Sequence, residues 1–402
     1  MELLKLFALF AVMMVVLVAL KKPLWLGASV AIILSFFVYR ISPPDALKLI
    51  GGAVTSRSTV EILAVIYLVN FLQVMMQKKG AIAQAESAMM RLFNNRRSII
   101  IFAPIFMGLL PAPNAVVLSA PIVDTTAGND LSVGDKTFLT SYLRHIPESA
   151  LPFYPGVLLA LSVTKLPAGM FLLGILPLAL LSILFCYATK VRKVPRDTGL
   201  PASKDKGQDL LQMLLALWPI IALTVVVLFG GFSTAVSTAA ACAALFIIYR
   251  FPMKELWPII KKAFHPSIMV GMLLIMIFKD IIASIGIINT LSSTFAGLPI
   301  PLFLVYALIT FIGSMTGLGN AVIAVLFPIA FSTIPGAGIP LLVLLMSFSH
   351  CAAQISPTHI CLEIAVNYFK SDFRTIIAKT LPVTLFYCVT ATLYYLLLTL
   401  IF

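Results

Sequence analysis

The sequence contains little charge, few acidic residues and few cysteines. Only 11% of its 402 residues are charged, and just 15 are Asp or Glu. A soluble protein of this length needs more polar side chains to cover its surface, so a soluble fold is excluded. The cysteines lack the spacing of a zinc site or a disulfide framework, and we interpret them as small packing residues. They are Cys186, Cys242, Cys351, Cys361 and Cys388.

Apolar residues dominate the chain instead. They make up 61% of it, the mean hydropathy is +1.07, and runs of about 20 apolar residues, enough to cross a bilayer, recur throughout. The sequence therefore predicts a polytopic α-helical membrane protein. The net charge of +13 is assigned to loops facing the cytoplasm, so no nucleic-acid partner is expected. The first apolar run ends in Lys21 and Lys22 without a small-residue cleavage site, and no cleavable signal is expected.

Equivalent residues recur in the same order at offsets of 205 to 210 positions. The pairs are Tyr39-Arg40 with Tyr249-Arg250, Gly80 with Gly286, Asn114 with Asn320, His145 with His350, Pro152 with Pro357, and Leu176-Pro177 with Leu381-Pro382. Such a drifting offset indicates two diverged copies with small insertions. We predict one repeat at 1–189, a polar linker at 190–209 and a second repeat at 210–402.

Each copy shows the same series of predicted elements. Three apolar spans come first, at 3–20, 23–41 and 58–77 and again at 210–230, 233–250 and 266–285. A short amphipathic stretch such as 81–93 follows, expected along the membrane interface. Two segments interrupted by Pro or Gly come next, at 98–124 and 137–164 in the first copy and at 301–330 and 338–367 in the second. An intact span, 168–189 or 379–400, closes each copy.

The positive charges favour one topology for these segments. If the first interrupted segment of each copy is a re-entrant hairpin, each copy crosses five times and the second copy is inverted. Then 21 of the 28 Lys and Arg residues lie on one side, as the positive-inside rule requires. A full crossing at each hairpin removes this bias. We therefore predict two inverted repeats of five transmembrane helices plus one re-entrant hairpin each, in the inner membrane, with both termini outside the cytoplasm.

The interruptions are the predicted functional region. Backbone without hydrogen-bond partners must be sheltered by protein or line a cavity, and inverted repeats with broken helices at the midplane are typical of secondary transporters. The hairpin tips, Pro113-Asn114 and Gly319-Asn320, are expected to meet there. Each asparagine either caps the returning helix, whose N–H groups favour an anion, or also binds a solute or cation directly. Ser356 is predicted as an N-cap with Pro357 at the first helical position.

The segments Asn114-Ala115…Pro121 and Asn320-Ala321…Pro328 resemble the Ser-Asn-Thr hairpin tips of the ion-transporter superfamily, which includes citrate, dicarboxylate, gluconate and arsenite permeases. The stretch QISPTHI resembles the second signature of those carriers. The resemblance implies a dimerising scaffold at 1–97 and 210–300, a moving transport part at 98–189 and 301–402, and an elevator mechanism coupled to Na⁺ or protons. The chain departs from the pattern in lacking hydroxyls at positions 113, 115, 319 and 321, which serve sodium and carboxylate binding in those carriers.

Four titratable residues near the interruptions are candidate proton carriers: His145, Glu148, His350 and His359. The histidines could instead only bind carbonyl groups freed by the breaks. His359 and Glu363 have a spacing that suits a metal, but without a third ligand no metal site is expected. Arg144 could neutralise a carboxylate substrate, although we favour a pairing with Asp124 or Asp135. For Lys279 and Asp280, a salt bridge or snorkelling towards the membrane surface is favoured over a functional role.

The leading hypothesis is a secondary transporter, not an enzyme, for a small anion such as an organic carboxylate. The expected binding residues are Pro113, Asn114, Ala115, Glu148, Ser149, Gly319, Asn320, Ala321, Ser356, Pro357 and Thr358. No cofactor is expected; Na⁺ is a candidate ligand, and a homodimer follows from the resemblance. The alternatives are a cation/proton antiporter using Glu148, an intramembrane metalloenzyme built on His350, His359 and Glu363, and a channel.

Overall fold

The computed structural model describes residues 2–20, 22–109, 115–198, 205–286 and 299–401, and every regular element within these ranges is a helix. The first half contains α1 (Glu2–Met14), η1 (Val15–Ala19), α2 (Leu24–Val38), α3 (Pro43–Thr55), α4 (Arg57–Lys78), α5 (Ala81–Phe93), α6 (Arg96–Gly108), α7 (Ala115–Ala127), α8 (Val133–Ala150), α9 (Pro155–Thr164), α10 (Ala168–Thr189) and η2 (Val191–Lys193). The second half contains α11 (Lys206–Phe229), α12 (Thr234–Ile248), α13 (Met253–Ala263), α14 (Pro266–Ser284), α16 (Leu302–Gly313), η3 (Ser314–Leu318), α17 (Gly319–Thr333), α18 (Ile339–Ala353), α19 (Ile360–Phe369) and α20 (Phe373–Ile401). The predicted all-α class is confirmed.

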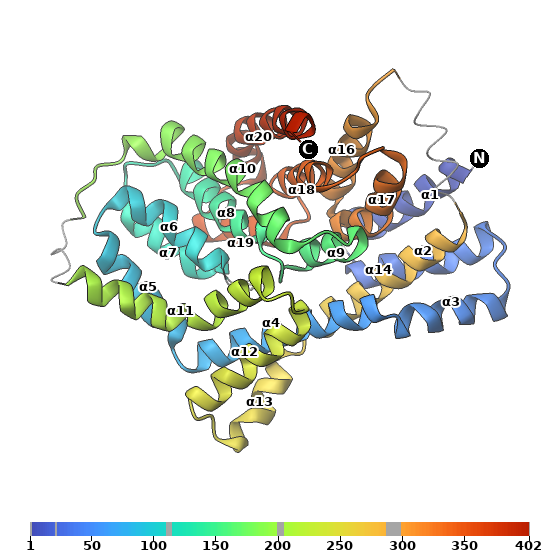
Figure 1. Ribbon diagram of the computed structural model, residues 1–402. Helices are drawn as coiled ribbons and strands as arrows, with labels where there is room; N and C mark the ends of the chain where they lie inside the picture. The colour runs from blue at the N-terminus through green and yellow to red at the C-terminus, as the bar shows by residue number, and fades with distance from the viewer. Residues whose placement is uncertain (1, 21, 110–114, 199–204, 287–298, 402) are drawn as a thin grey trace.

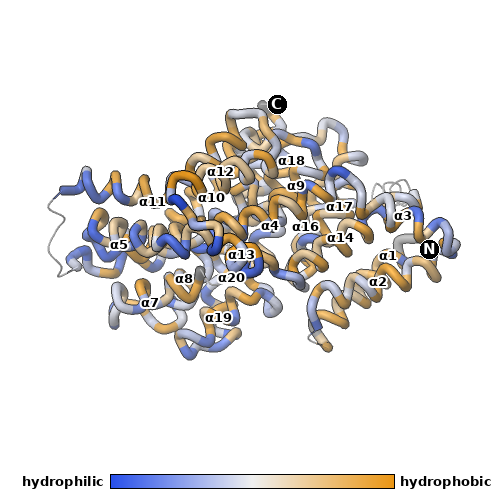
Figure 2. The backbone as a smooth tube through the Cα atoms, turned by 90° about the horizontal axis from the view of Figure 1, so that it is seen from below, coloured by the Kyte–Doolittle hydropathy of each residue, from blue (hydrophilic) through white to orange (hydrophobic). Residues whose placement is uncertain are grey.

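Seven helical segments of the described chain are long and apolar enough to cross a membrane, by length and composition. They are Arg57–Lys78, Val133–Thr164, Ala168–Thr189, Lys206–Phe229, Pro266–Ser284, Leu302–Thr333 and Phe373–Leu400. Apolar side chains also cover the outside of the molecule: Phe229 is 81% and Leu400 85% exposed. Figure 2 shows the hydrophilic residues gathered mainly on α5, on α13 and at the start of α11. The architecture is therefore compatible with a polytopic membrane protein.

Two helices were not predicted. α3 and α13 each lie between the second and third apolar spans of their half. At the start of α3, Ser42 accepts a hydrogen bond from the backbone N–H of Asp45, and Pro43 occupies the first turn. Both helices carry charged residues, so a search for apolar spans passes over them. By contrast, α5 coincides with the predicted amphipathic stretch at 81–93; the corresponding segment after Gly286 lies outside the described residues.

The second apolar span of each half packs against the third apolar span of the other half. α2 of the first half packs against α14 of the second, while α4 packs against α12. The two unpredicted helices follow the same rule, because α3 packs against α14 and α13 packs against α4. In Figure 1, α2, α3 and α14 run side by side, and α4, α12 and α13 form the corresponding group. Each half therefore completes the packing of the other.

The chain folds back on itself in both predicted hairpin segments. α6 packs against α7, and the predicted tip at Pro113-Asn114 lies outside the described residues. α16 packs against α17 so closely that a Cβ on Gly313 would overlap the side chain of Val322. In a continuous helix, residues nine positions apart lie about 13.5 Å apart along the axis. The reversal uses Gly317, whose φ of 85° is a left-handed conformation that favours glycine.

Both predicted breaks in the following spans are present, but their details differ. α8 runs through Pro147 and ends at Ala150, and α9 begins at Pro155. The predicted helix start at Pro357 is wrong: α19 begins at Ile360, with His359 at the N-cap position. Ser356 Oγ accepts instead from the backbone N–H of Thr358 at 3.3 Å, which bends the chain into a turn before the helix.

The predicted capping role of Asn320 is also wrong. α17 begins one residue earlier, at Gly319, and no side chain caps it. Asn320 therefore lies within the first turn of the helix, past the position from which an asparagine side chain reaches the unpaired N–H groups.

Candidate functional site

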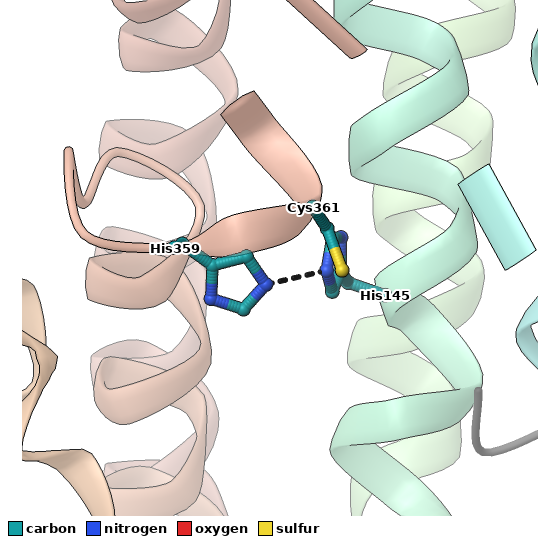
Figure 3. Close-up of side chains that lie close together, drawn as sticks. All are labelled: His145, His359 and Cys361. Atoms are coloured by element: carbon teal, nitrogen blue, oxygen red, sulfur yellow. Dashed lines mark hydrogen bonds between the residues drawn. The ribbon is translucent and has the colours of Figure 1, made fainter. Parts of the chain in front are cut away.

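The candidate site lies where α8, the first helix of the broken span in the first half, meets α19, the second helix of the broken span in the second half. α8 packs against α19, and α7 packs against both. Figure 3 shows His145 on α8 facing His359 and Cys361, which come from the turn before α19 and from its first turn. These residues belong to different halves of the chain, so the site exists only when the halves are assembled.

The two histidines form a direct pair. Their Nε2 atoms lie 2.7 Å apart, and His145 is only 2% exposed. The Nδ1 atom of His145 lies 2.5 Å from the backbone carbonyl oxygen of Ser141. A carbonyl only accepts, so Nδ1 carries a proton and the Nε2 of neutral His145 presents its lone pair to His359. For the pair to form a hydrogen bond, His359 must therefore donate its Nε2–H to His145.

Arg144 brings a positive charge into the same region. Its side chain is 3% exposed, and Nη1 donates to Oε2 of Glu148 at 2.7 Å and to Sγ of Cys361 at 3.3 Å. A buried arginine is tolerated only when it is paired in this way. Glu148 itself is 34% exposed, and its Oε2 lies 3.7 Å from Nε2 of His145. The cluster therefore combines a fixed positive charge with a partly exposed carboxylate.

The predicted pairing of Arg144 with Asp124 or Asp135 is wrong. Asp124 binds Lys136 at 2.7 Å, whereas Asp135 binds Lys190 at 2.8 Å and Lys379 at 3.2 Å. All of these pairs lie at the end of the bundle where α8 begins. Arg144 lies nine residues, or about two and a half helical turns, further along α8, too far from Asp135 for a side-chain contact along a straight helix.

A glycine lets the first hairpin approach the site. Gly108, the last residue of α6, packs directly on the backbone of α8 at Arg144, and its carbonyl oxygen accepts a hydrogen bond from Tyr154 at 2.5 Å. Tyr154 lies in the break between α8 and α9. α6, α8 and the break are thus held together beside Arg144.

Replacing Gly108 by alanine is expected to destabilise the protein by about 1–3 kcal/mol, the usual effect of overpacking. The added Cβ would overlap the carbonyl oxygen of Arg144, a backbone atom that cannot move without displacing α8. Thermal unfolding in detergent measures the effect. Gly52→Ala is the control, because nothing lies within 4 Å of its Cβ position in α3. Equal melting temperatures for the two variants would contradict this packing.

The second hairpin tip lies beside the turn that leads into α19. A Cβ on Gly317 would contact the hydroxyl of Thr358, and Ser314 in the same tip hydrogen-bonds Ser349 of α18 at 2.9 Å. Asn320 reaches the other break, where its Oδ1 lies 3.5 Å from the Cβ position of Gly156 in the first turn of α9. The second hairpin therefore contacts both breaks.

The structure brings together some of the predicted site residues and not others. His145, Glu148 and His359 meet at the cluster, and Thr358 lies beside the second hairpin. Ser149 is buried and bonds only its own helix, through Ile146. His350 lies against the rings of Tyr142 and Tyr387, at centroid distances of 6.1 and 5.8 Å.

The remaining predicted residues are placed as follows: Ala115 begins α7, Ala321 is fully buried in α17, Pro357 and Glu363 are exposed, Gly319 begins α17 near Ser314 and Ser349, Ser356 bonds Thr358, and Pro113 and Asn114 lie outside the described residues.

Cys361 is the functional candidate that sequence reasoning missed. It was interpreted as a packing residue, and it does pack against Val116 in the first turn of α7. Its sulfur, however, also accepts a hydrogen bond from Arg144, 217 positions away in sequence. The local signal in the sequence is that Cys361 follows His359 by only two residues.

The comparisons with known proteins give a family but no activity. A search of the curated proteins finds no match. One family model, described as "Protein of unknown function (DUF401)", matches residues 2–401, which is nearly the whole chain. The chain belongs to the DUF401 family.

Proposed function

We propose that the protein is a secondary active transporter of a small anion, an organic carboxylate, and that protons drive it. The observation that carries the proposal is the buried Arg144, paired with a carboxylate that is itself partly exposed. A fixed positive charge with a neutralisable counter-ion, at the junction of two broken helices, is suited to binding and releasing an anion.

The surroundings of Arg144 favour a carboxylate. A guanidinium presents parallel N–H donors that match the two oxygens of a carboxylate. The first turn of α19, which contains Cys361, adjoins Arg144, and the N–H groups at a helix start favour negative charge. Glu148 is the acidic residue of the cluster that could attract a cationic substrate, and it already pairs with Arg144.

The same geometry supplies a coupling mechanism. While Glu148 is ionised, it occupies Nη1 of Arg144 at 2.7 Å. When a proton neutralises Glu148, the charge that competes for Arg144 is removed and a substrate carboxylate can take its place, so proton and anion bind together. The His145–His359 pair, 3.7 Å from Glu148 at its nearest approach, is positioned to deliver that proton. This arrangement favours proton coupling over sodium coupling.

The exchanged packing of the halves supports the transporter architecture. Two inverted repeats would produce reciprocal contacts such as α2 with α14 and α4 with α12. In the proposed mechanism, residues 1–97 and 210–300 form a static scaffold that dimerises. Residues 98–189 and 301–402, which carry the hairpins and the cluster, move across the membrane as an elevator.

Uptake by proteoliposomes tests the proposal. The protein is reconstituted, pH and sodium gradients are imposed separately, and labelled carboxylates of different size and charge are offered. We expect at least one carboxylate to accumulate when the outside is acidic, and a sodium gradient alone to have no effect. Cation-dependent proton movement without anion uptake would instead indicate a cation/proton antiporter. No gradient-dependent flux of any panel member would contradict the proposal.

A further inference from the structure

We propose that His145, His359 and Cys361 form a binding site for one divalent transition-metal ion of the zinc type. Nε2 or Nδ1 of each histidine and Sγ of Cys361 lie within 4.8 Å of one another. Two imidazoles and one thiolate are a ligand set that zinc and cobalt prefer. The sequence paired His359 only with Glu363 and gave no third ligand. In the structure the other two ligands are His145, from α8, and Cys361, from the first turn of α19.

The spacing of the ligand atoms is close to that of a tetrahedral centre. Zinc–nitrogen distances of about 2.0–2.1 Å and zinc–sulfur distances of about 2.3 Å place neighbouring ligand atoms roughly 3.3–3.6 Å apart. The Nε2 atoms of His145 and His359, now 2.7 Å apart, would separate by about half an ångström to admit the ion. His359 precedes the first turn of α19, so a small shift of the turn before it suffices.

The groups behind the ligands are already arranged for metal binding. A metal-bound histidine usually donates its second ring N–H to a carbonyl or carboxylate, which fixes the tautomer. His145 does so through Nδ1 to the Ser141 carbonyl oxygen at 2.5 Å, leaving Nε2 for the metal. At Cys361, the guanidinium of Arg144 lies 3.3 Å from the sulfur, and this neighbouring positive charge partly offsets the cost that burial imposes on the thiolate form that metals bind.

The positive charge of Arg144 does not oppose this site, because Glu148 balances it at 2.7 Å. Oε2 of the same carboxylate lies 3.7 Å from Nε2 of His145, but Glu148 does not belong to the group of three residues whose ligand atoms all lie within 4.8 Å of one another. A bound ion would therefore have three protein ligands, from α8 and from the segment around the start of α19, and its fourth position would be open to water.

An ion bound at this place is expected to inhibit transport, an expectation that rests on the proposed transport function. Metal binding would fix α8 of the first half to α19 of the second and would occupy the lone pair that His145 presents to His359. Micromolar zinc is therefore expected to inhibit proton-driven uptake. Uptake measured with a chelator tests transport by itself, so failure of the metal site and failure of the transport proposal can be told apart.

Cobalt titration of the purified full-length protein in detergent tests the site directly. We expect one Co²⁺ per chain, with a sulfur-to-cobalt charge-transfer band that Zn²⁺ displaces. The band should disappear in Cys361→Ser and weaken in His359→Gln. Cys351→Ser is the matched control, since Cys351 is buried in α18 and its sulfur faces the Thr384 carbonyl oxygen instead. Variants are compared only after their melting temperatures match the parent.

A charge-transfer band that survives in Cys361→Ser, or that is lost equally in Cys351→Ser, would overturn the proposed site. So would the absence of any Co²⁺ or Zn²⁺ binding to the parent protein. Retention of the band in Cys351→Ser together with its loss in Cys361→Ser would assign the sulfur ligand.

Discussion

Uptake of the anion is expected to fall at least about 100-fold when Arg144 is replaced by glutamine. Truncating one member of a buried charge pair costs about 2–5 kcal/mol, and 2.7 kcal/mol corresponds to about 100-fold in affinity. The variant loses the positive charge that would hold the substrate and leaves Glu148 without its 2.7 Å partner. The measurement is initial uptake rate in proteoliposomes under an inward proton gradient.

Two further variants show whether the effect belongs to the site. Arg144→Lys keeps the charge but loses the parallel donors, so we expect an intermediate rate. Lys136→Gln removes another ion pair of α8, that with Asp124, and is expected to retain uptake. Equal losses in Arg144→Gln and Lys136→Gln would assign Arg144 a purely structural role.

The second large effect concerns coupling. Glu148→Gln mimics the protonated carboxyl and permanently removes the negative charge that competes with the substrate for Arg144. We therefore expect the variant to exchange labelled for unlabelled anion across the membrane while losing accumulation driven by a pH gradient. Counterflow and gradient-driven uptake, measured on the same proteoliposomes, separate the two activities.

Glu363→Gln is the control for this experiment. Glu363 is an exposed carboxylate of α19, four residues after His359 in sequence. Its replacement is expected to leave coupling intact. Accumulation by Glu148→Gln that still follows the pH gradient would mean that another group carries the proton.

Local sequence patterns predicted much of the fold. Apolar run length predicted the long helices, and Pro and Gly in mid-run predicted the breaks, although the second hairpin segment reverses at Gly317, two residues before the predicted tip at Gly319-Asn320. The short-range ion pair was also foreseen: Lys279 and Asp280 lie 3.0 Å apart. These features depend on residues close together in sequence, where helix geometry and the cost of buried charge act directly.

The partners within the site could not be predicted in the same way. Arg144 contacts Cys361 and His145 contacts His359 across more than 200 positions, and only the assembled fold sets these distances. Sequence position suggested a surface partner for Arg144 and an apolar role for Cys361. The short helices α3 and α13 were missed for a different reason, because their mixed composition lies between that of a span and that of a loop.

Thermal unfolding of the purified protein with a panel of small carboxylates tests the central claim, that Arg144 is the anchor of an anion site. A ligand that binds the folded state raises the melting temperature, by more when its concentration is higher relative to its Kd. We expect at least one carboxylate to stabilise the parent and Lys136→Gln, and to have no effect on Arg144→Gln. Stabilisation that persists undiminished in Arg144→Gln, or that no carboxylate produces in the parent, would contradict the claim.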